Sequence, residues 1–456
     1  MKKIIVFGGG QVGSSVAKIL SDDGNDITLV DYDKDVLSDL REKMDIKTIH
    51  GLASYPSVQK LADAENSDMI IAVTGSDEVN MAACHVAKSI YNVPKRIARL
   101  RANEYLRDED DFDKSAFSIS EVISPNILLT DYVKNILDHP GAFQAFQFAS
   151  GRVQVLGATV LPDSPLAGKK LSEFKNHMPN VDVRVVAIYR DKQHLIPNGD
   201  TIVLPDDDVF FLATEENMRF MSELRKSPIR PHNVMIAGGG RVGSALAKKL
   251  ESIYSIKLIE KDKYIAKQVA QELSSTVVLN NDIADETLLN NENINEVDYF
   301  CAVTNNDQMN ILSAKLAKDM GAKKTIAIVN KSSYRNLVSK EIDIVVSPED
   351  VTIGSLLASV RTSDIVNVHQ LGTADAEAME IIVHGDKKTS KLVGKKISQL
   401  ELPDSALIGA IVRNNNVLLA NDDFMIETGD HVIIFVLEKK DITNIEKMFQ
   451  VSVGFF

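Results

Sequence analysis

Short apolar runs alternate with amphipathic stretches at the start of the chain. Residues 4–7 are apolar and β-branched or aromatic, which predicts a buried strand. Apolar residues then recur at helical spacing from Val12 to Leu20, and a second apolar run covers residues 27–30. This order of strand, helix and strand predicts a βαβ unit with a parallel sheet.

The same alternation continues as far as residue 125. Amphipathic stretches predict further helices and apolar runs predict further strands. The expected helices are at 36–44, 58–64 and 77–91, and the expected strands are at 46–49, 69–73 and 96–100. We therefore expect residues 1–125 to form a Rossmann-like domain, a doubly wound parallel sheet covered by helices.

A linking helix and a smaller domain follow. Residues 126–150 are expected to be the linking helix, stopped by the His-Pro-Gly sequence that begins at His139, itself expected to be only a turn residue. Apolar residues then alternate as in strands, and residues 151–226 are expected to form a small α+β domain. Three aspartates at 206–208 are expected to form a solvated turn, with a metal cluster as the alternative.

The second half of the chain repeats this pattern. Ala302-Val303-Thr304 copies Ala72-Val73-Thr74, and Ser347-Pro348 copies Ser124-Pro125. The expected parts are a second Rossmann-like domain at 232–348, a second linking helix at 349–366 and a second small α+β domain at 367–453. The fold class is therefore α/β, with two Rossmann-like doubly wound parallel-sheet domains, each followed by a small α+β domain, in a tandem duplication.

Each predicted Rossmann-like domain has a glycine-rich turn between its first strand and first helix. The G-x-G-x-x-G spacing is formed by Gly8, Gly10 and Gly13 in the first copy and by Gly238, Gly240 and Gly243 in the second. In a dinucleotide-binding turn, the first glycine allows the tight turn, the second lets the backbone approach a pyrophosphate, and the third lets helix and strand pack closely. The helix N-terminus offers free N–H groups to the phosphates.

Further candidate residues follow the expected strands, because ligands bind beyond the carboxyl ends of strands in this fold. Asp31 and Glu260 end the second strand of each copy and can accept hydrogen bonds from ribose hydroxyls. Arg99 aligns with Ile328, so the second copy lacks this cation and is expected to neutralise a bis-phosphate less well. The other candidates are Leu52, Ala53, Thr74 and Gly75 in the first copy and Asp282, Thr304 and Asn305 in the second.

Composition excludes several classes of function. The net charge of −13 over 456 residues argues against a general binder of nucleic acid, which needs a basic surface. The two cysteines form no C-x-x-C motif and are expected to be buried, reduced thiols in a cytoplasmic protein. No uncharged stretch reaches the roughly 20 apolar residues of a membrane-spanning helix. We therefore expect any membrane association to go through a partner.

The duplicated glycine turns, the Ala-Val-Thr strands and the two Gly-Lys-Lys sequences resemble the TrkA family, the regulatory subunits of Trk-type bacterial potassium uptake systems. Each half is similar to a regulator-of-potassium-conductance (RCK) module, and the likeness extends to 96–99, 139–142 and 429–433. The resemblance implies binding of NAD(H), with ATP or ADP as further ligands. It also implies a homo-oligomer, a tetramer that forms a ring of eight modules, docked to a Trk-type membrane potassium channel subunit. The protein would then be cytoplasmic and peripheral on the inner face of the membrane.

The resemblance also adds ligand positions within the glycine turns. These are Gly9, Gln11 and Val12 in the first copy and Gly239, Arg241 and Val242 in the second. The missing counterpart of Arg99 leaves the ligand of the second site open. Which nucleotide activates or inhibits is also open.

Two other functions compete with a nucleotide-sensing regulator. An NAD-dependent dehydrogenase needs an acid or base beside the nicotinamide. His177 and His194 of the first small domain have no counterparts in the second, so we expect no enzyme. A nucleotide-binding scaffold without a channel partner is the third possibility. The acidic run at 108–113 is expected to be a solvated loop, with an interaction loop as the alternative.

Overall fold

A computed structural model describes most of the chain. The described residues are 2–102, 105, 117–173, 182–191, 193–218, 232–338, 341–361, 364–372 and 376–451. The acidic run at 108–113 and His177 lie outside them. The chain divides into two compact units, of which unit 1 comprises residues 1–128 and 348–360 and unit 2 comprises residues 129–347 and 361–456.

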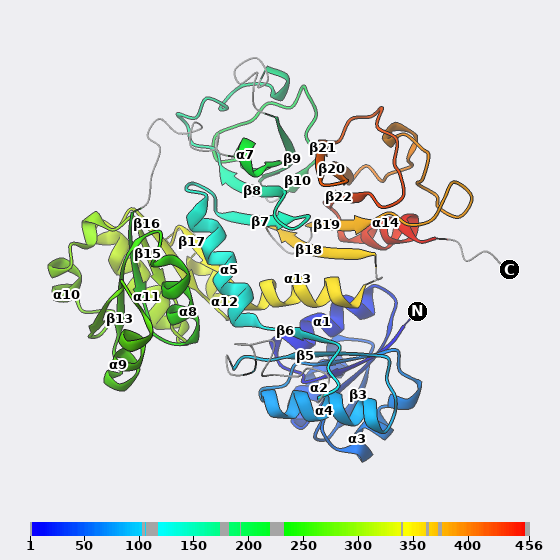
Figure 1. Ribbon diagram of the computed structural model, residues 1–456, viewed down its shortest axis with the longest axis horizontal. Helices are drawn as coiled ribbons and strands as arrows, with labels where there is room; N and C mark the ends of the chain where they lie inside the picture. The colour runs from blue at the N-terminus through cyan, green and yellow to red at the C-terminus, as the bar shows by residue number, and fades with distance from the viewer. Residues whose placement is uncertain are drawn as a thin grey trace. The chain divides into compact units, whose positions relative to one another are not determined.

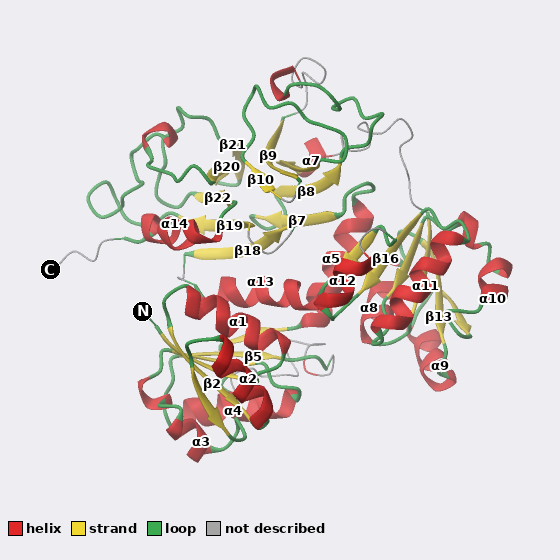
Figure 2. Ribbon diagram, turned by 180° about the vertical axis from the view of Figure 1, so that it is seen from behind, coloured by secondary structure: helices red, strands yellow, loops and turns green. Residues whose placement is uncertain are grey.

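Unit 1 contains the first doubly wound sheet (Figure 2). Its strands run parallel in the order β3-β2-β1-β4-β5-β6, so the strand order reverses between β1 and β4. The strands are β1 (Lys3–Phe7), β2 (Asp26–Asp31), β3 (Lys47–His50), β4 (Met69–Ala72), β5 (Lys95–Arg99) and β6 (Glu121–Ile123), and the helices are α1 (Gln11–Asp22), α2 (Lys34–Lys43), α3 (Pro56–Leu61) and α4 (Asp77–Ser89). The predicted Rossmann-like fold is confirmed.

Alternate residues of β1 face the two sides of this sheet. Ile4 and Val6 belong to a core cluster with residues of α1 and α2, whereas Ile5 and Phe7 belong to a second cluster with residues of α4. All four side chains are at most 2% exposed. A strand buried on both faces explains why residues 4–7 show no polar alternation.

A helix from the second half of the sequence completes unit 1. Helix α13 (Pro348–Val360) packs on α1, and Figure 1 shows the two helices side by side. Ile353, Leu356 and Leu357 are at most 4% exposed in the same core cluster as Val16 of α1. The linking helix of the second half therefore covers the Rossmann-like domain of the first half.

Unit 2 contains the second doubly wound sheet, in the equivalent order β14-β13-β12-β15-β16-β17. The strands are β12 (Asn233–Ala237), β13 (Ser255–Glu260), β14 (Val277–Asn280), β15 (Tyr299–Ala302), β16 (Lys324–Ile328) and β17 (Ile344–Val346). The helices are α8 (Arg241–Leu250), α9 (Lys263–Glu272), α10 (Glu286–Asn291), α11 (Asp307–Asp319) and α12 (Ser332–Val338). The predicted duplication of the large domain is confirmed.

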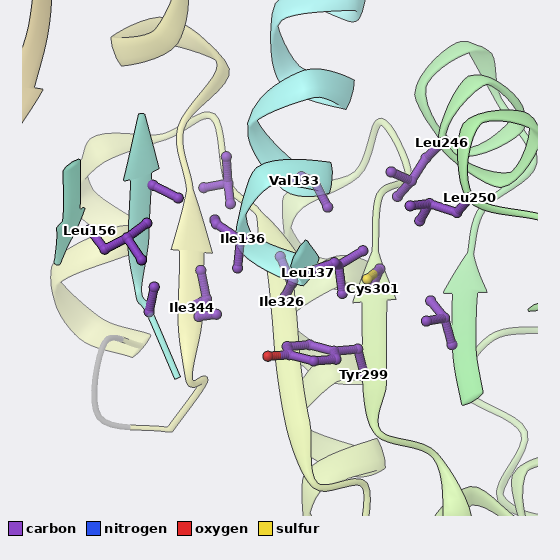
Figure 3. Packing of buried hydrophobic residues seen from close by; sticks show 14 of the residues in the cluster. Val133, Ile136, Leu137, Leu156, Leu246, Leu250, Tyr299, Cys301, Ile326 and Ile344 are labelled. Atoms are coloured by element: carbon purple, nitrogen blue, oxygen red, sulfur yellow. The ribbon is translucent and has the colours of Figure 1, made fainter. Parts of the chain in front are cut away.

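The first linking helix packs against this second sheet. Helix α5 (Pro125–Asp138) places Val133 and Leu137 in one core cluster with Leu250, Tyr299 and Cys301 (Figure 3). Its polar side adds an ion pair between Asp131 and Lys249 of α8. Each linking helix thus packs on the Rossmann-like domain of the other half of the sequence.

Neither linking segment is helical throughout. Helix α5 stops at Asp138, directly before the His-Pro-Gly sequence that was expected to stop it, and residues 144–148 of the expected 126–150 segment form strand β7 (Gln144–Phe148). Helix α13 stops at Val360, before strand β18 (Ile365–Leu371). Apolar residues in these short strands alternate too briefly for their period to be distinguished from the end of a helix.

The two small domains, both in unit 2, contain antiparallel sheets in the equivalent orders β10-β9-β11-β8-β7 and β21-β20-β22-β19-β18. The first also has β8 (Val153–Thr159), β9 (Val183–Arg190), β10 (Gln193–Leu195), β11 (Asp208–Thr214) and α7 (Glu215–Met218). The second also has β19 (Ala376–Ile382), β20 (Ala406–Arg413), β21 (Asn416–Leu419), β22 (His431–Val436) and α14 (Ile442–Phe449). Single-turn 3₁₀ helices occur at Ala64–Asn66, Ile294–Glu296, Ile397–Gln399 and Lys439–Asp441.

The run of three aspartates at 206–208 is not a solvated turn throughout, which corrects the expectation. Asp207 is 1% exposed and accepts two hydrogen bonds from Arg190, from Nε at 2.7 Å and from Nη2 at 2.6 Å. Asp430 and Arg413 repeat this pair in the second small domain. The expectation was wrong because a buried ion pair between residues distant in sequence leaves no periodic pattern.

The described part of the chain contains neither a cluster of metal-ligating residues nor a membrane-spanning helix. No group of three or more metal-ligating side chains occurs among these residues. None of the helices that the structure describes is long and apolar enough to cross a bilayer.

Candidate functional site

The first glycine turn places backbone atoms where only glycine fits. Gly8 has φ +106°, and a Cβ there would lie 3.0 Å from the backbone of Thr74. A Cβ on Gly13 would lie 1.9 Å from the carbonyl oxygen of Gly8. Gly10, in contrast, has nothing within 4 Å of its Cβ position. The first and third glycines are therefore needed for packing, and the second leaves an open approach to the backbone.

Helix α1 begins at this turn without a side-chain cap. Its N-cap residue is Gly10, and no side chain accepts a hydrogen bond from the first turn. Helices α2 and α4 of the same unit are capped by Asp33 and Ser76, whose side chains accept backbone N–H groups. Helix α1 therefore retains N–H groups and the positive end of its dipole, which together suit a phosphate.

Asp31 lies beside the glycine turn, at the end of β2. Its Oδ2 accepts a hydrogen bond from the Gly9 N–H at 2.5 Å, and its Oδ1 accepts one from the Asp33 N–H at 2.8 Å. These bonds orient the carboxylate, and each oxygen keeps a further lone pair. Asp31 is thus held at the edge of the turn with lone pairs that can accept further hydrogen bonds.

Arg99 brings a buried cation to the carboxyl ends of the strands. The side chain is 9% exposed, and its Nη2 donates to the carbonyl oxygens of Val73 and Thr74, both at 2.8 Å. Its Nε is buried without a hydrogen-bond partner in the described structure. Burial, with a smaller contribution from Arg101, lowers the pKa of Arg99 to about 10, so the guanidinium is still charged at neutral pH. A buried cation with an unused donor fits an anionic ligand group.

Asn80 of α4 contacts the carboxyl ends of these strands, although the sequence analysis did not include it in the site. Its Oδ1 accepts from the Thr74 N–H at 2.9 Å and from the Thr74 hydroxyl at 2.7 Å, and its Nδ2 donates to the Arg99 carbonyl at 2.9 Å. Asn310 makes the same three bonds to Thr304 and Ile328 in the second copy. The identical spacing from the Ala-Val-Thr strand in both copies is the signal that could have identified it.

The second glycine turn has the same geometry as the first. Gly238 has φ +111°, and a Cβ on Gly243 would lie 1.8 Å from the Gly238 carbonyl oxygen. Helix α8 has Gly240 as its N-cap and no side-chain cap. Glu260 accepts from the Gly239 N–H at 2.7 Å and from the Asp262 N–H at 2.8 Å, as Asp31 does in the first copy.

Side chains beyond the strands differ between the two copies. Leu52 is 40% exposed in the first copy, whereas Asp282 in the second is 2.8 Å from the ammonium group of Lys261. The hydrogen bond from Lys261, with help from the Ala284 N–H, lowers the pKa of Asp282. Ile328 is 3% exposed in a hydrophobic core cluster, so no cation replaces Arg99 on that strand.

The remaining candidates differ in how they are exposed. Val12 packs against the core cluster and Ala53 is 5% exposed, so these residues present mainly backbone to a ligand. Gly75 has an open Cβ position. Gln11, Arg241 and Asn305 are exposed, and Thr74, Thr304 and Val242 are half-buried.

Comparison with protein-family models matches both halves of the chain. The TrkA-N domain matches residues 4–125 and 234–348, and the TrkA-C domain matches residues 155–225 and 386–449. The Trk system potassium uptake protein TrkA of Halomonas elongata is 46% identical over 456 residues, covering 100% of both chains. The protein of that name from Vibrio alginolyticus is 44% identical and covers 99% of both. The chain belongs to the TrkA family.

The relatives are named as potassium uptake proteins, and none of these names describes an enzyme. A crystal structure of the GsuK RCK domain covers 98% of this chain and 95% of its own, with a TM-score of 0.61 and 18% identity. A structure titled GsuK channel bound to NAD covers 98% of this chain and 78% of its own, with a TM-score of 0.59 and 17% identity. These likenesses confirm the fold class.

Proposed function

We propose that this protein is a cytoplasmic regulatory subunit that senses NAD(H) or adenine nucleotides and gates a Trk-type membrane potassium channel subunit. The observation that carries the proposal is the pair of glycine turns, each with an uncapped helix and an oriented acid, in a chain of the TrkA family. The GsuK channel of the same fold, described as bound to NAD, supports the choice of ligand.

In the first unit, the proposed ligand is held at three points. The N–H groups at the start of α1 bind the pyrophosphate, beside the open Cβ position of Gly10. Asp31 accepts from the ribose hydroxyls and repels a 2′-phosphate, so NADP is expected to bind more weakly than NAD. Arg99 neutralises a further phosphate group at the carboxyl ends of β4 and β5.

The second unit is proposed to bind a nucleotide with less help from cations. It repeats the glycine turn and the acid, but Ile328 stands in place of Arg99. We expect it to have the lower affinity for ligands that carry several phosphates.

The proposed mechanism couples nucleotide binding to a change of shape in an oligomer. Four chains, each with two modules, would form a closed ring of eight modules on the inner face of the membrane. A ligand can change the ring only if it prefers one of its shapes, and coupling of about 1–3 kcal/mol per site is typical. By reciprocity, docking to the channel subunit should alter nucleotide affinity.

The proposal is tested by calorimetric titration of the full chain with NADH, NAD, ATP and ADP, alongside Asp31→Ala. We expect Asp31→Ala to weaken NADH binding by about 1–3 kcal/mol, because it removes hydrogen bonds to a charged group. Native mass measurement should give a tetramer, and potassium flux through the co-reconstituted channel should change with the nucleotide. Equal NADH affinity of the natural protein and Asp31→Ala would contradict the proposal. Potassium flux that does not change with any nucleotide would also contradict it.

A dehydrogenase makes the opposite prediction for the same protein. A regulator binds NADH without consuming it. Steady oxidation of NADH with simple carbonyl substrates, above the rate in buffer, would favour the enzyme over the regulator.

A further inference from the structure

Helix α3 of unit 1 carries a polar side chain, Gln59, that is completely buried. It is 0% exposed, and its Nε2 donates to the carbonyl oxygens of Ala53 at 2.9 Å and of Ala83 at 3.0 Å. Its Oε1 is buried without a hydrogen-bond partner in the described structure. Only the amide nitrogen can face two carbonyl oxygens as a donor, so these contacts fix the orientation of the amide.

The first of these bonds holds the β3–α3 loop (51–55), which lies beside the first glycine turn. Strand β3 pairs with β2, with His50 opposite Asp31. The Gly51 N–H at the start of the loop donates to the Asp31 carbonyl at 2.9 Å, and Ala53 in the middle of the loop accepts from Gln59. The loop is therefore fixed next to the acid that is proposed to bind a ribose.

The second bond reaches helix α4, which is held to the carboxyl ends of β4 and β5. Asn80 of α4 bonds to Thr74 and to the Arg99 carbonyl, and Ala83 follows it by three residues on the same face of the helix. Helix α3 itself packs against both β3 and α4 (Figure 1). Gln59 therefore ties the β3–α3 loop to the helix that also holds the strand ends of the site.

The second copy of the fold lacks this amide. Leu289 of α10 occupies the position of Gln59 and is also 0% exposed. A buried amide oxygen without a partner costs free energy, which offsets much of what the two hydrogen bonds contribute. An apolar residue fills the same place in an equivalent sheet, so the stability of the fold does not account for Gln59.

We propose that Gln59 is a positioning residue that holds the β3–α3 loop in the shape that receives the adenosine end of the nucleotide at the first site. In a dinucleotide-binding fold, the acid after the second strand binds the ribose of that end, and the loop lies beside this acid. Without the bridge, the loop populates other shapes, and affinity falls in proportion to the lost fraction of the competent one. The proposal rests on the proposed nucleotide binding at the first glycine turn.

The test is a titration of the full chain with NADH, followed by amide hydrogen exchange. Protection of α1 reports binding at the first site, and exchange of α8 reports the second. Gln59→Leu, which introduces the residue of the second copy, should speed exchange of the β3–α3 loop and weaken NADH binding at the first site about tenfold. Exchange of α8 should match that of the natural protein at every NADH concentration. The melting temperature without ligand should stay the same or rise.

Smaller ligands show which end of the nucleotide the loop receives. AMP keeps the adenosine end, so its binding at the first site should weaken in Gln59→Leu by the same factor as that of NADH. Inorganic pyrophosphate binds only at the start of α1 and should protect this helix equally in both proteins. An equal loss for pyrophosphate would overturn the assignment to the adenosine end.

Ser67→Ala is the matched control within unit 1. Ser67 is 7% exposed, and its Oγ donates to the Ala64 carbonyl at 2.8 Å, before the start of β4 and so at the opposite ends of the strands from the site. Its loss should lower the melting temperature and leave NADH affinity unchanged. If Gln59→Leu does not fold, Gln59→Met keeps the length of the side chain without the amide and should give the same pattern.

The outcomes separate this proposal from the proposed function. If NADH does not protect α1 of the natural protein at any concentration, the proposed function fails. If NADH protects α1 equally well in the natural protein and in folded Gln59→Leu or Gln59→Met, only the role of Gln59 is overturned. A lower melting temperature with unchanged NADH affinity, the behaviour expected of Ser67→Ala, would likewise mean that Gln59 is merely structural.

Discussion

The two Rossmann-like domains share a backbone and differ in the charges at one edge of the sheet. Both keep the glycine turn, the uncapped helix and the acid that accepts a hydrogen bond from a glycine N–H. In both, an asparagine also accepts a hydrogen bond from the hydroxyl of the threonine that follows β4 or β15. At the fifth strand, Arg99 of the first copy is replaced by the buried Ile328. At the loop after the third strand, the exposed Leu52 is replaced by Asp282, paired with Lys261.

This difference separates what the fold requires from what a ligand requires. Groups that hold the turn and the strand ends together are the same in both copies, since both sheets need them. A buried cation with an unused Nε does not stabilise the sheet by itself, because burial of an unpaired charge costs free energy. Its presence in one copy alone supports the proposal that the first site binds the more highly charged ligand.

The largest expected effect comes from the third glycine of each turn. Gly13→Ala and Gly243→Ala each place a Cβ within 2 Å of a carbonyl oxygen, at 1.9 Å and 1.8 Å. We expect each to cost about 1–3 kcal/mol of unfolding free energy and to abolish ligand-induced stabilisation from its own site. That stabilisation is about 2.7 kcal/mol at a ligand concentration of 100 Kd. Thermal unfolding with and without NADH measures both.

Gly10→Ala is the control for this prediction. Its Cβ would touch nothing, so unfolding free energy should change by less than about 0.5 kcal/mol. The methyl group nevertheless stands where the phosphate approaches, so NADH stabilisation should also be lost. Normal NADH binding by Gly13→Ala would show that the turn is not the site.

The next effect concerns the first strand of each small domain, where Phe146 of β7 and His369 of β18 occupy equivalent positions. Their rings stack at 4.9 Å, and Phe148 packs edge-on to His369 at 5.2 Å. Burial lowers the pKa of His369 to about 4, with Glu380 acting in the opposite sense. The unfolded state therefore binds more protons between about pH 4 and 6.5, and the unfolding free energy falls as pH decreases through this window.

The loss is at most about 3 kcal/mol, and it is smaller to the extent that water reaches the partly exposed ring. His369→Phe makes the two halves alike and should remove this pH dependence. Denaturant unfolding between pH 4 and 7 provides the measurement, and an unchanged slope in the variant would refute the assignment.

A smaller effect is expected when the first site is made like the second. Arg99→Met removes a charge-assisted contact and should weaken ATP binding at the first site by about 2 kcal/mol, or about 30-fold. Stability should not fall, because the variant also removes a buried unpaired Nε. Calorimetry with ATP and with adenosine distinguishes loss of the charge from a change in pocket shape, since loss of the charge alone should leave adenosine binding unaffected. Equal loss for both ligands would mean that Arg99 only shapes the pocket.

The smallest effect is expected from exchanging Leu52, which follows β3, with Asp282, which follows β14. Asp282→Leu breaks the pair with Lys261, which is largely exposed and therefore worth less than about 1 kcal/mol. Leu52→Asp introduces a carboxylate into the first site without an equivalent lysine, because Tyr32 occupies the position of Lys261. We expect only a few-fold change in affinity, in opposite directions for the two substitutions and smaller at high salt because salt screens exposed charges. A change larger than tenfold would show that these residues contact the base directly.

Much of the fold was predictable from short-range patterns. The G-x-G-x-x-G spacing, the apolar strands and the acids Asp31 and Glu260 occur twice, and the structure places them together at equivalent edges. Strands β7 and β18 were not predicted, because they are too short for their period to be distinguished from the end of a helix. Asn80, Asp207 and the contact of His139 with Gln154 were missed, because each depends on a partner remote in sequence.

The sequence by itself determined the duplication, the two doubly wound sheets and the residues of the two glycine turns, since these depend on local spacing and repetition. Only the tertiary structure decided that α13 covers the first Rossmann-like domain and α5 the second. It also decided that Arg99 is buried with an unused donor. Hydrophobic burial is non-directional, so an apolar helix face specifies that it must be covered without specifying by which domain.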